Sequence, residues 1–154
     1  MNRWSALFLF ALFAVPIALI DIREYRIPDF LTLSGTTVFA TVKFLWESQS
    51  ATQLAAELCV GFGVFWMIWR LTRGQIGLGD AKFSAFIAVT TGFAGWFAAL
   101  FIGSLLGLLS AGVLVGILKT DRRVLIPFAP FLAMGAFITI LCGNFSGLLA
   151  EFKM

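Results

Sequence analysis

The sequence predicts an all-α polytopic membrane protein, a bundle of about six transmembrane helices in which the fourth is short. Of its 154 residues, 60% are hydrophobic and only 12% are charged, and the mean hydropathy is +0.99. A soluble domain of this size needs more charged residues to cover its surface. The apolar residues also form runs close to the roughly 20 helical residues that cross a bilayer core. The length suits one domain, and we expect residues 1–154 to form a single membrane-embedded unit.

Six apolar runs define the predicted helices. They are roughly Trp4–Ile20, Phe30–Trp46, Leu54–Trp69, Ala81–Thr91, Trp96–Leu118 and Val124–Cys142. The first lacks a clear cleavage site, so we expect a retained helix rather than a signal peptide. The fourth reaches only about 17 Å at about 1.5 Å per residue. Either the fourth and fifth helices are offset, or the fourth begins below the membrane surface, within protein or a wet cavity.

Charged loops predict the orientation of these helices. Eight of the eleven basic residues lie in the loops after the first, third and fifth runs, namely Arg23, Arg26, Arg70, Arg73, Lys82, Lys119, Arg122 and Arg123. The positive-inside rule places these loops in the cytoplasm and both termini outside. Their charge is expected to set topology and to contact anionic lipid of the bilayer. The net charge of +3 therefore needs no nucleic-acid partner.

The sequence gives no support for a metal or cofactor. Histidine is absent, and neither Cys59 nor Cys142 belongs to a CxxC motif. A zinc site built from cysteine and histidine is therefore not expected. Both cysteines lie in apolar runs, and we interpret them as inert core thiols rather than as a disulfide.

Most of the eight acidic residues have plain structural interpretations. We interpret Glu24, Glu47, Asp121 and Glu151 as solvated loop or helix-end charges. Glu57 is expected to reach the outer interface from the third helix. Asp29 follows Pro28 and precedes an apolar run, as the N-cap residue of a helix does.

Asp21 and Asp80 fit such interpretations less well. Asp21 directly follows the first apolar run, where its charge would face the negative end of the helix dipole, at membrane depth. Asp80 follows the stretch "GQIGLG" and begins the fourth helix, so simple N-capping stays open for it. Carboxylates that share one proton can activate water for attack on a peptide bond. On the dipole argument, Asp80 would be the ionised base and Asp21 the protonated acid.

Three motifs resemble those of the type IV prepilin peptidases, which are membrane aspartic proteases. Gly77-Leu78-Gly79-Asp80, followed by Ala81-Lys82, is similar to the family's GxGDxK motif. Asp21 and the following "IREYRIP" resemble the first family aspartate with its basic stretch, except that Asp29 stands where asparagine is usual. The stretch "IPFAPFLAMG", residues 126–135, resembles IPFGPFLxxG, with Ala129 in place of a glycine. Together the motifs span about residues 15–140.

The resemblance implies a prepilin leader peptidase of the cytoplasmic (inner) membrane. It implies Asp21 and Asp80 as catalytic residues, and the site-shaping residues would be Gly77, Gly79, Lys82, Pro28 and Pro127. The substrate would be a prepilin or pseudopilin, with a short basic leader and an apolar helix, cut at the cytoplasmic membrane border. Larger family members carry an insertion with paired CxxC motifs and N-methylate the product. This chain looks like the compact peptidases of Tad/Flp pilus systems, and methylation is not expected.

Three other interpretations stay open on the sequence. One is a related GxGD protease of the preflagellin or presenilin type. A second is a small proton-coupled transporter with Asp21 and Asp80 as proton carriers. A third is an inactive assembly factor of a pilus machine. Cleavage of a prepilin by the purified protein would separate a protease from the last two.

Overall fold

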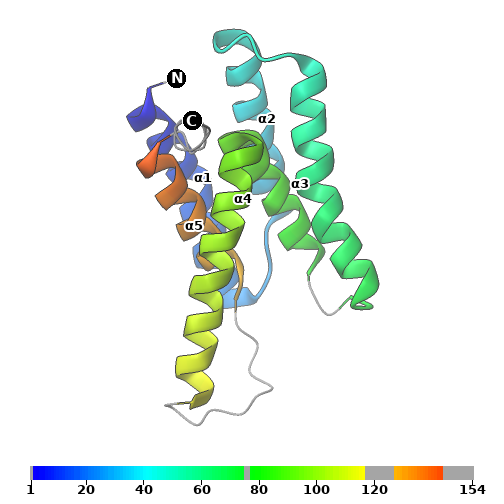
Figure 1. The fold of residues 1–154 in the computed structure, drawn as a ribbon, viewed down its shortest axis with the longest axis vertical. Coiled ribbons are helices and arrows are strands. Elements are labelled where there is room, and N and C mark those ends of the chain that lie inside the picture. Colours follow the sequence, from blue (N-terminus) through cyan, green and yellow to red (C-terminus); the bar gives the residue numbers. More distant parts are fainter. Residues whose placement is uncertain (1, 75–76, 117–126, 144–154) are drawn as a thin grey trace, which may run out of the picture.

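The computed structural model describes residues 2–74, 77–116 and 127–143. These residues form five helices and no strand (Figure 1), which confirms the all-helical prediction. The helices are α1 (Arg3–Glu24), α2 (Asp29–Trp46), α3 (Ala51–Leu71), α4 (Leu78–Gly116) and α5 (Ala129–Cys142).

The prediction of six helices is matched only in part, because the fourth and fifth runs follow each other within α4 without a loop between them. Within α4, Gly92 leaves helical geometry with φ 72° and ψ 175°. A positive φ favours glycine, which has no Cβ. In Figure 1 the chain rises through the first half of α4 and descends through the second. The expected boundary between Thr91 and Trp96 is therefore present as a sharp break at Gly92 instead of a loop. The half of α4 that precedes Gly92 corresponds to the short fourth helix of the prediction.

Helix length and composition suit a membrane for part of this bundle. α1, α3 and residues Leu78–Val113 of α4 are long and apolar enough to cross a bilayer, whereas α5 is apolar but shorter. α2 is rich in threonine and serine, whose hydroxyl groups donate to carbonyl oxygens of the preceding turn, as Thr36 does to Thr32 at 2.7 Å. Its side-chain donors are therefore satisfied within the helix.

Aromatic rings and small residues hold the helices together. Phe86 of α4 is fully buried and contacts Phe10 of α1 and Phe39 of α2, with ring centroids 5.4 and 5.7 Å apart. α4 and α5 approach so closely that a Cβ on Gly103 would lie 2.9 Å from the Phe131 carbonyl oxygen. Small residues allow such close helix contacts in membrane proteins. α4 is therefore the central element, in contact with α2, α3 and α5.

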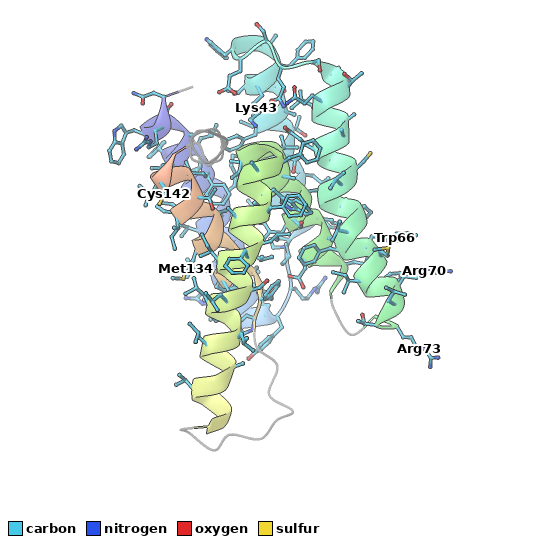
Figure 2. All side chains as sticks on the ribbon, viewed as in Figure 1. Lys43, Trp66, Arg70, Arg73, Met134 and Cys142 are labelled. Carbon is cyan, nitrogen blue, oxygen red and sulfur yellow. The ribbon has the colours of Figure 1, made fainter. Side chains whose placement is uncertain are left out.

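The basic residues after α3 lie at one particular end of the bundle. The α1–α2 connection and the start of α4 lie at one end, and the start of α1 lies at the other (Figure 1). Figure 2 places Arg70 and Arg73 away from Lys43, toward the end of the α1–α2 connection. This arrangement agrees with the predicted grouping of basic loops. Lys119, Asp121, Arg122, Arg123, Glu151 and Lys153 lie outside the described residues.

Two sequence-based interpretations are wrong in the structure. Cys59 and Cys142 are both exposed on the surface of the bundle, so they are not core thiols. Glu57 does not reach an interface but is 1% exposed. Its Oε1 atom accepts a hydrogen bond from Gln49 Nε2 at 2.8 Å, and Oε2 has no partner among the described residues. Together with buried Lys43, Glu57 lines a cavity of about 550 Å³ beside Gly92.

Candidate active site

A cavity of about 310 Å³ lies where the α1–α2 connection meets the start of α4. Five residues predicted for the site line it, namely Asp21, Gly77, Gly79, Asp80 and Lys82. Its other lining residues are Tyr25, Arg26, Ile27, Asp29 and Leu78. The fold thus brings together two segments that are far apart in the sequence. The two predicted prolines do not line the cavity, but each precedes a helix near it.

Asp21 is held by the beginning of α5. It lies in the last turn of α1, is 6% exposed, and its Oδ2 atom accepts a hydrogen bond from the backbone N–H of Ala129 at 3.1 Å. Ala129 is the first residue of α5, and N–H groups in the first turn of a helix have no partner within it. The Asp21 carboxylate therefore also faces the positive end of the α5 dipole. The sequence-based argument missed this contact because it considered only the helix that carries Asp21.

Asp80 lies in the first turn of α4 and is half-buried. Its backbone N–H donates to the Gly77 carbonyl oxygen at 3.1 Å, and its carboxylate accepts a hydrogen bond from the Gly77 backbone. Asp21 and Asp80 line the same cavity, one from the end of α1 and the other from the start of α4. Both acids thus lie at a helix N-terminus, Asp21 at the start of α5 and Asp80 at the start of α4, whereas the sequence predicted this only for Asp80.

The two glycines of the GxGD motif have different environments. A Cβ atom on Gly79 would lie 2.8 Å from Ile27 Cβ, closer than an ordinary contact. The absence of a side chain at Gly79 therefore allows the start of α4 to pack against the α1–α2 connection. A Cβ on Gly77 would lie at an ordinary 3.6 Å from Asp80 Oδ2. Neither glycine has a positive φ, in contrast to Gly74, where φ is 84°.

An ion pair joins α2 to α4 at the cavity wall. Lys82 Nζ lies 2.7 Å from Asp29 Oδ1. Asp29 is the first residue of α2, and Pro28 takes the N-cap position. The interpretation of Asp29 as an N-cap is therefore wrong, because its carboxylate binds Lys82 instead. The Pro28 carbonyl oxygen accepts a hydrogen bond from the Thr32 N–H at 3.3 Å, which starts α2.

Pro127 lies directly before Phe128, the N-cap residue of α5. The Phe128 carbonyl oxygen accepts the N–H groups of Phe131 and Leu132 at 3.1 and 3.2 Å. This first turn leaves the Ala129 N–H directed at Asp21. The segment that contains Pro127 thus contributes to the site through α5, which positions the hydrogen-bond donor to Asp21.

The lining residues define the chemistry that the cavity can perform. Among the described residues, the lining includes neither serine nor cysteine, so these residues offer no nucleophilic side chain of those types there. Two carboxylates in one confined space can instead exchange a proton with water and with a carbonyl oxygen. The arrangement therefore suits general acid–base hydrolysis.

Comparison with known proteins identifies a family. The family model described as "Type IV leader peptidase family" matches residues 7–112, more than half of the chain, and this range includes both acids. The curated "Prepilin leader peptidase/N-methyltransferase" of Xanthomonas campestris pv. campestris is 29% identical over 139 residues, 86% of this chain and 48% of that protein.

The proteins of the same name from Bacillus subtilis and Pseudomonas putida are 29% and 25% identical. Each match covers 83% of this chain, with 52% and 46% of the relative. The chain thus spans about half the length of these curated relatives. No solved structure matches it significantly. The apolar helices and this match together indicate a membrane protein. The chain belongs to the type IV leader peptidase family, as the three sequence motifs predicted.

Proposed function

We propose that this protein is an aspartic endopeptidase that removes the leader from prepilins or pseudopilins, with Asp21 and Asp80 as the catalytic pair. The observation that carries the proposal is that these acids come from different helices and line one cavity. Within the part of the chain that the structure describes, no salt bridge joins Asp21 or Asp80 to a basic side chain, whereas Asp29, in the same cavity, is paired with Lys82. We therefore propose a structural role for Asp29 and catalytic roles for Asp21 and Asp80.

The proposed reaction needs one proton shared between the two carboxyl groups. The ionised carboxylate takes a proton from water, and the water oxygen attacks the scissile carbonyl carbon. The protonated carboxyl group donates its proton to the carbonyl oxygen. When the tetrahedral intermediate collapses, a proton passes to the departing amine, and the pair returns to its starting state.

Backbone donors hold each carboxylate in place for these steps. Asp21 is bound by the Ala129 N–H, and Asp80 is bound by the Gly77 backbone. Because both carboxylates have this support, the helix dipoles do not separate base from acid in the way that the sequence suggested. We propose that the two acids titrate as one coupled unit, to which the proton belongs jointly.

Cleavage is proposed at the cytoplasmic border of the inner membrane, with the termini outside. Arg26 lines the cavity, and Arg70 and Arg73 lie toward the same end of the bundle (Figure 2). The basic residues thus gather where the positive-inside rule expects the cytoplasm. The curated relatives are also named N-methyltransferases. We propose peptidase activity alone, because the chain has no CxxC motif.

Cleavage of a prepilin by the purified protein in detergent tests the proposal. Asp21→Asn and Asp80→Asn should each lower kcat by about 10²-fold to 10⁴-fold, the usual contribution of an acid–base group. Asp29→Asn, which removes a carboxylate from the same cavity, is the matched control and should keep most activity. Retained cleavage in either of the first two variants would exclude the catalytic pair. An inactive wild-type protein that carries protons in vesicles would favour the transporter interpretation.

A further inference from the structure

An apolar groove runs between α2 and α3, with α4 as its floor. Its volume is about 350 Å³. Thr32 and Thr36 form the α2 wall, Cys59 and Phe62 form the α3 wall, and Ala85 and Lys82 lie on α4. α2 and α3 both pack against α4.

The walls of this groove suit an apolar partner, although two of its residues are threonines. The Thr32 hydroxyl donates to the Asp29 carbonyl oxygen at 3.0 Å, and the Thr36 hydroxyl donates to the Thr32 carbonyl oxygen at 2.7 Å. Their donors are thus used within α2, which makes the threonines compatible with an apolar neighbour. An apolar helix could contact this surface without leaving a hydroxyl donor unpaired.

The groove and the catalytic cavity adjoin at Lys82. This residue lines both spaces, and its ion-pair partner Asp29 lines the cavity. A second apolar groove, of about 220 Å³, lies between α1 and α5 and includes Ala18 and Ala133. It shares no lining residue with the cavity. Of these two grooves, only the first therefore shares a wall with the cavity that holds the two acids.

We propose that the apolar helix of the substrate docks in the groove between α2 and α3, and that its polar leader passes Lys82 into the catalytic cavity. This inference rests on the proposed function. A prepilin-like substrate joins an apolar helix directly to a polar segment that is cut. Its binding surface must therefore have an apolar part next to the site of the acids, and this groove adjoins that site at Lys82. The space holds a few side chains, so it anchors one face of the helix.

The two native cysteines provide a matched crosslinking test. Cys59 lies in the groove. Cys142 is the last residue of α5 and lies away from the end of the bundle that carries Arg70 and Arg73 (Figure 2). Single cysteines are placed along the apolar helix of a prepilin, and disulfide formation is induced in membranes containing Asp80→Asn enzyme, which leaves the substrate uncut. With Cys142→Ser in addition, crosslinks to Cys59 should form at positions three or four residues apart. With Cys59→Ser instead, no such series should form with Cys142.

Groove-filling substitutions provide a kinetic test. Thr36→Phe should raise KM about tenfold with little change in kcat, as expected when an apolar anchor is displaced. Ala18→Phe, which fills the groove between α1 and α5, should leave both constants unchanged. If the wild-type enzyme cleaves but Cys59 never crosslinks and Thr36→Phe has normal KM, the groove holds lipid and the inference is wrong. A wild-type protein without cleavage would instead overturn the proposed function, and the crosslinks would still report whether a helix binds there.

Discussion

Replacing Gly79 by alanine tests the geometric explanation of the GxGD motif. The new Cβ would lie 2.8 Å from Ile27 Cβ, whereas ordinary contacts begin at about 3.4 Å. The start of α4 and the α1–α2 connection must then separate by about 0.6 Å, the difference between these two distances. Both segments line the cavity, so the two acids would shift relative to each other. Because a misplacement of about 1 Å can lower a rate about 10²-fold, we expect a tenfold to hundredfold loss of kcat/KM.

Two opposing effects decide the stability of the same variant. Alanine is a better helix former than glycine, by about 1 kcal/mol in a helix interior. Overpacking a close contact costs about 1–3 kcal/mol. Since Gly79 is near the helix start, where the propensity gain is smaller, the clash should dominate and the melting temperature in detergent should fall.

Gly77→Ala is the matched control for this experiment. Its Cβ would meet Asp80 Oδ2 at 3.6 Å, an ordinary contact, and Gly77 has no positive φ. We therefore expect near-normal cleavage and melting. Normal activity in Gly79→Ala would refute the packing argument. Equal losses in both variants would indicate that the glycines serve the approach of a substrate backbone rather than the contact with Ile27.

The remaining predictions concern protonation, stability, metal and topology. A pair of carboxyl groups that shares one proton should give a bell-shaped pH profile of kcat, because the base is protonated at low pH and the acid loses its proton at high pH; a flat profile would contradict the shared proton. Gln49→Ala should lower the free energy of unfolding by about 1–3 kcal/mol, because the buried Glu57 Oε1 atom loses its hydrogen-bond donor. The same variant should keep its kcat, because Gln49 does not line the catalytic cavity. A chelator should not affect cleavage, and inhibition reversed by zinc would contradict this. Reporter fusions after Arg73 and at the C-terminus should lie on opposite sides of the membrane.

Elements with a strong local signal were predicted well from the sequence. The apolar runs located most helices, since length and composition are what a bilayer selects. Gly92 shows where this reasoning stops. The sequence separates the fourth and fifth apolar runs near this residue. Only the backbone angles show that Gly92 alone turns the chain, without a loop. The exposed cysteines show a related failure, because an apolar run does not tell which face of a helix packs against its neighbours.

The features of the structure that the sequence did not predict are mostly contacts between different segments of the chain. The motifs indicated that Asp21 and Asp80 belong together, and the fold places both on one cavity. The Lys82–Asp29 ion pair was missed because Asp29 has a plausible local role after Pro28, which concealed a partner on another helix. The burial of Glu57 was missed for a similar reason, since its partner Gln49 lies in the preceding connection.

The contact between Asp21 and Ala129 changes how the third motif is understood. The stretch around residues 126–135 resembles the family pattern, yet its described part, residues 127–135, contributes no residue to the cavity lining. Its contribution is a backbone N–H, which any residue except proline can offer. Substitution of a family glycine by Ala129 therefore keeps the hydrogen bond to Asp21. The GxGD motif similarly supplies the Gly77 backbone to Asp80. Two of the three motifs thus contact the acids through main-chain groups at helix starts, which explains how Ala129 can stand in place of a glycine while the hydrogen bond to Asp21 is kept.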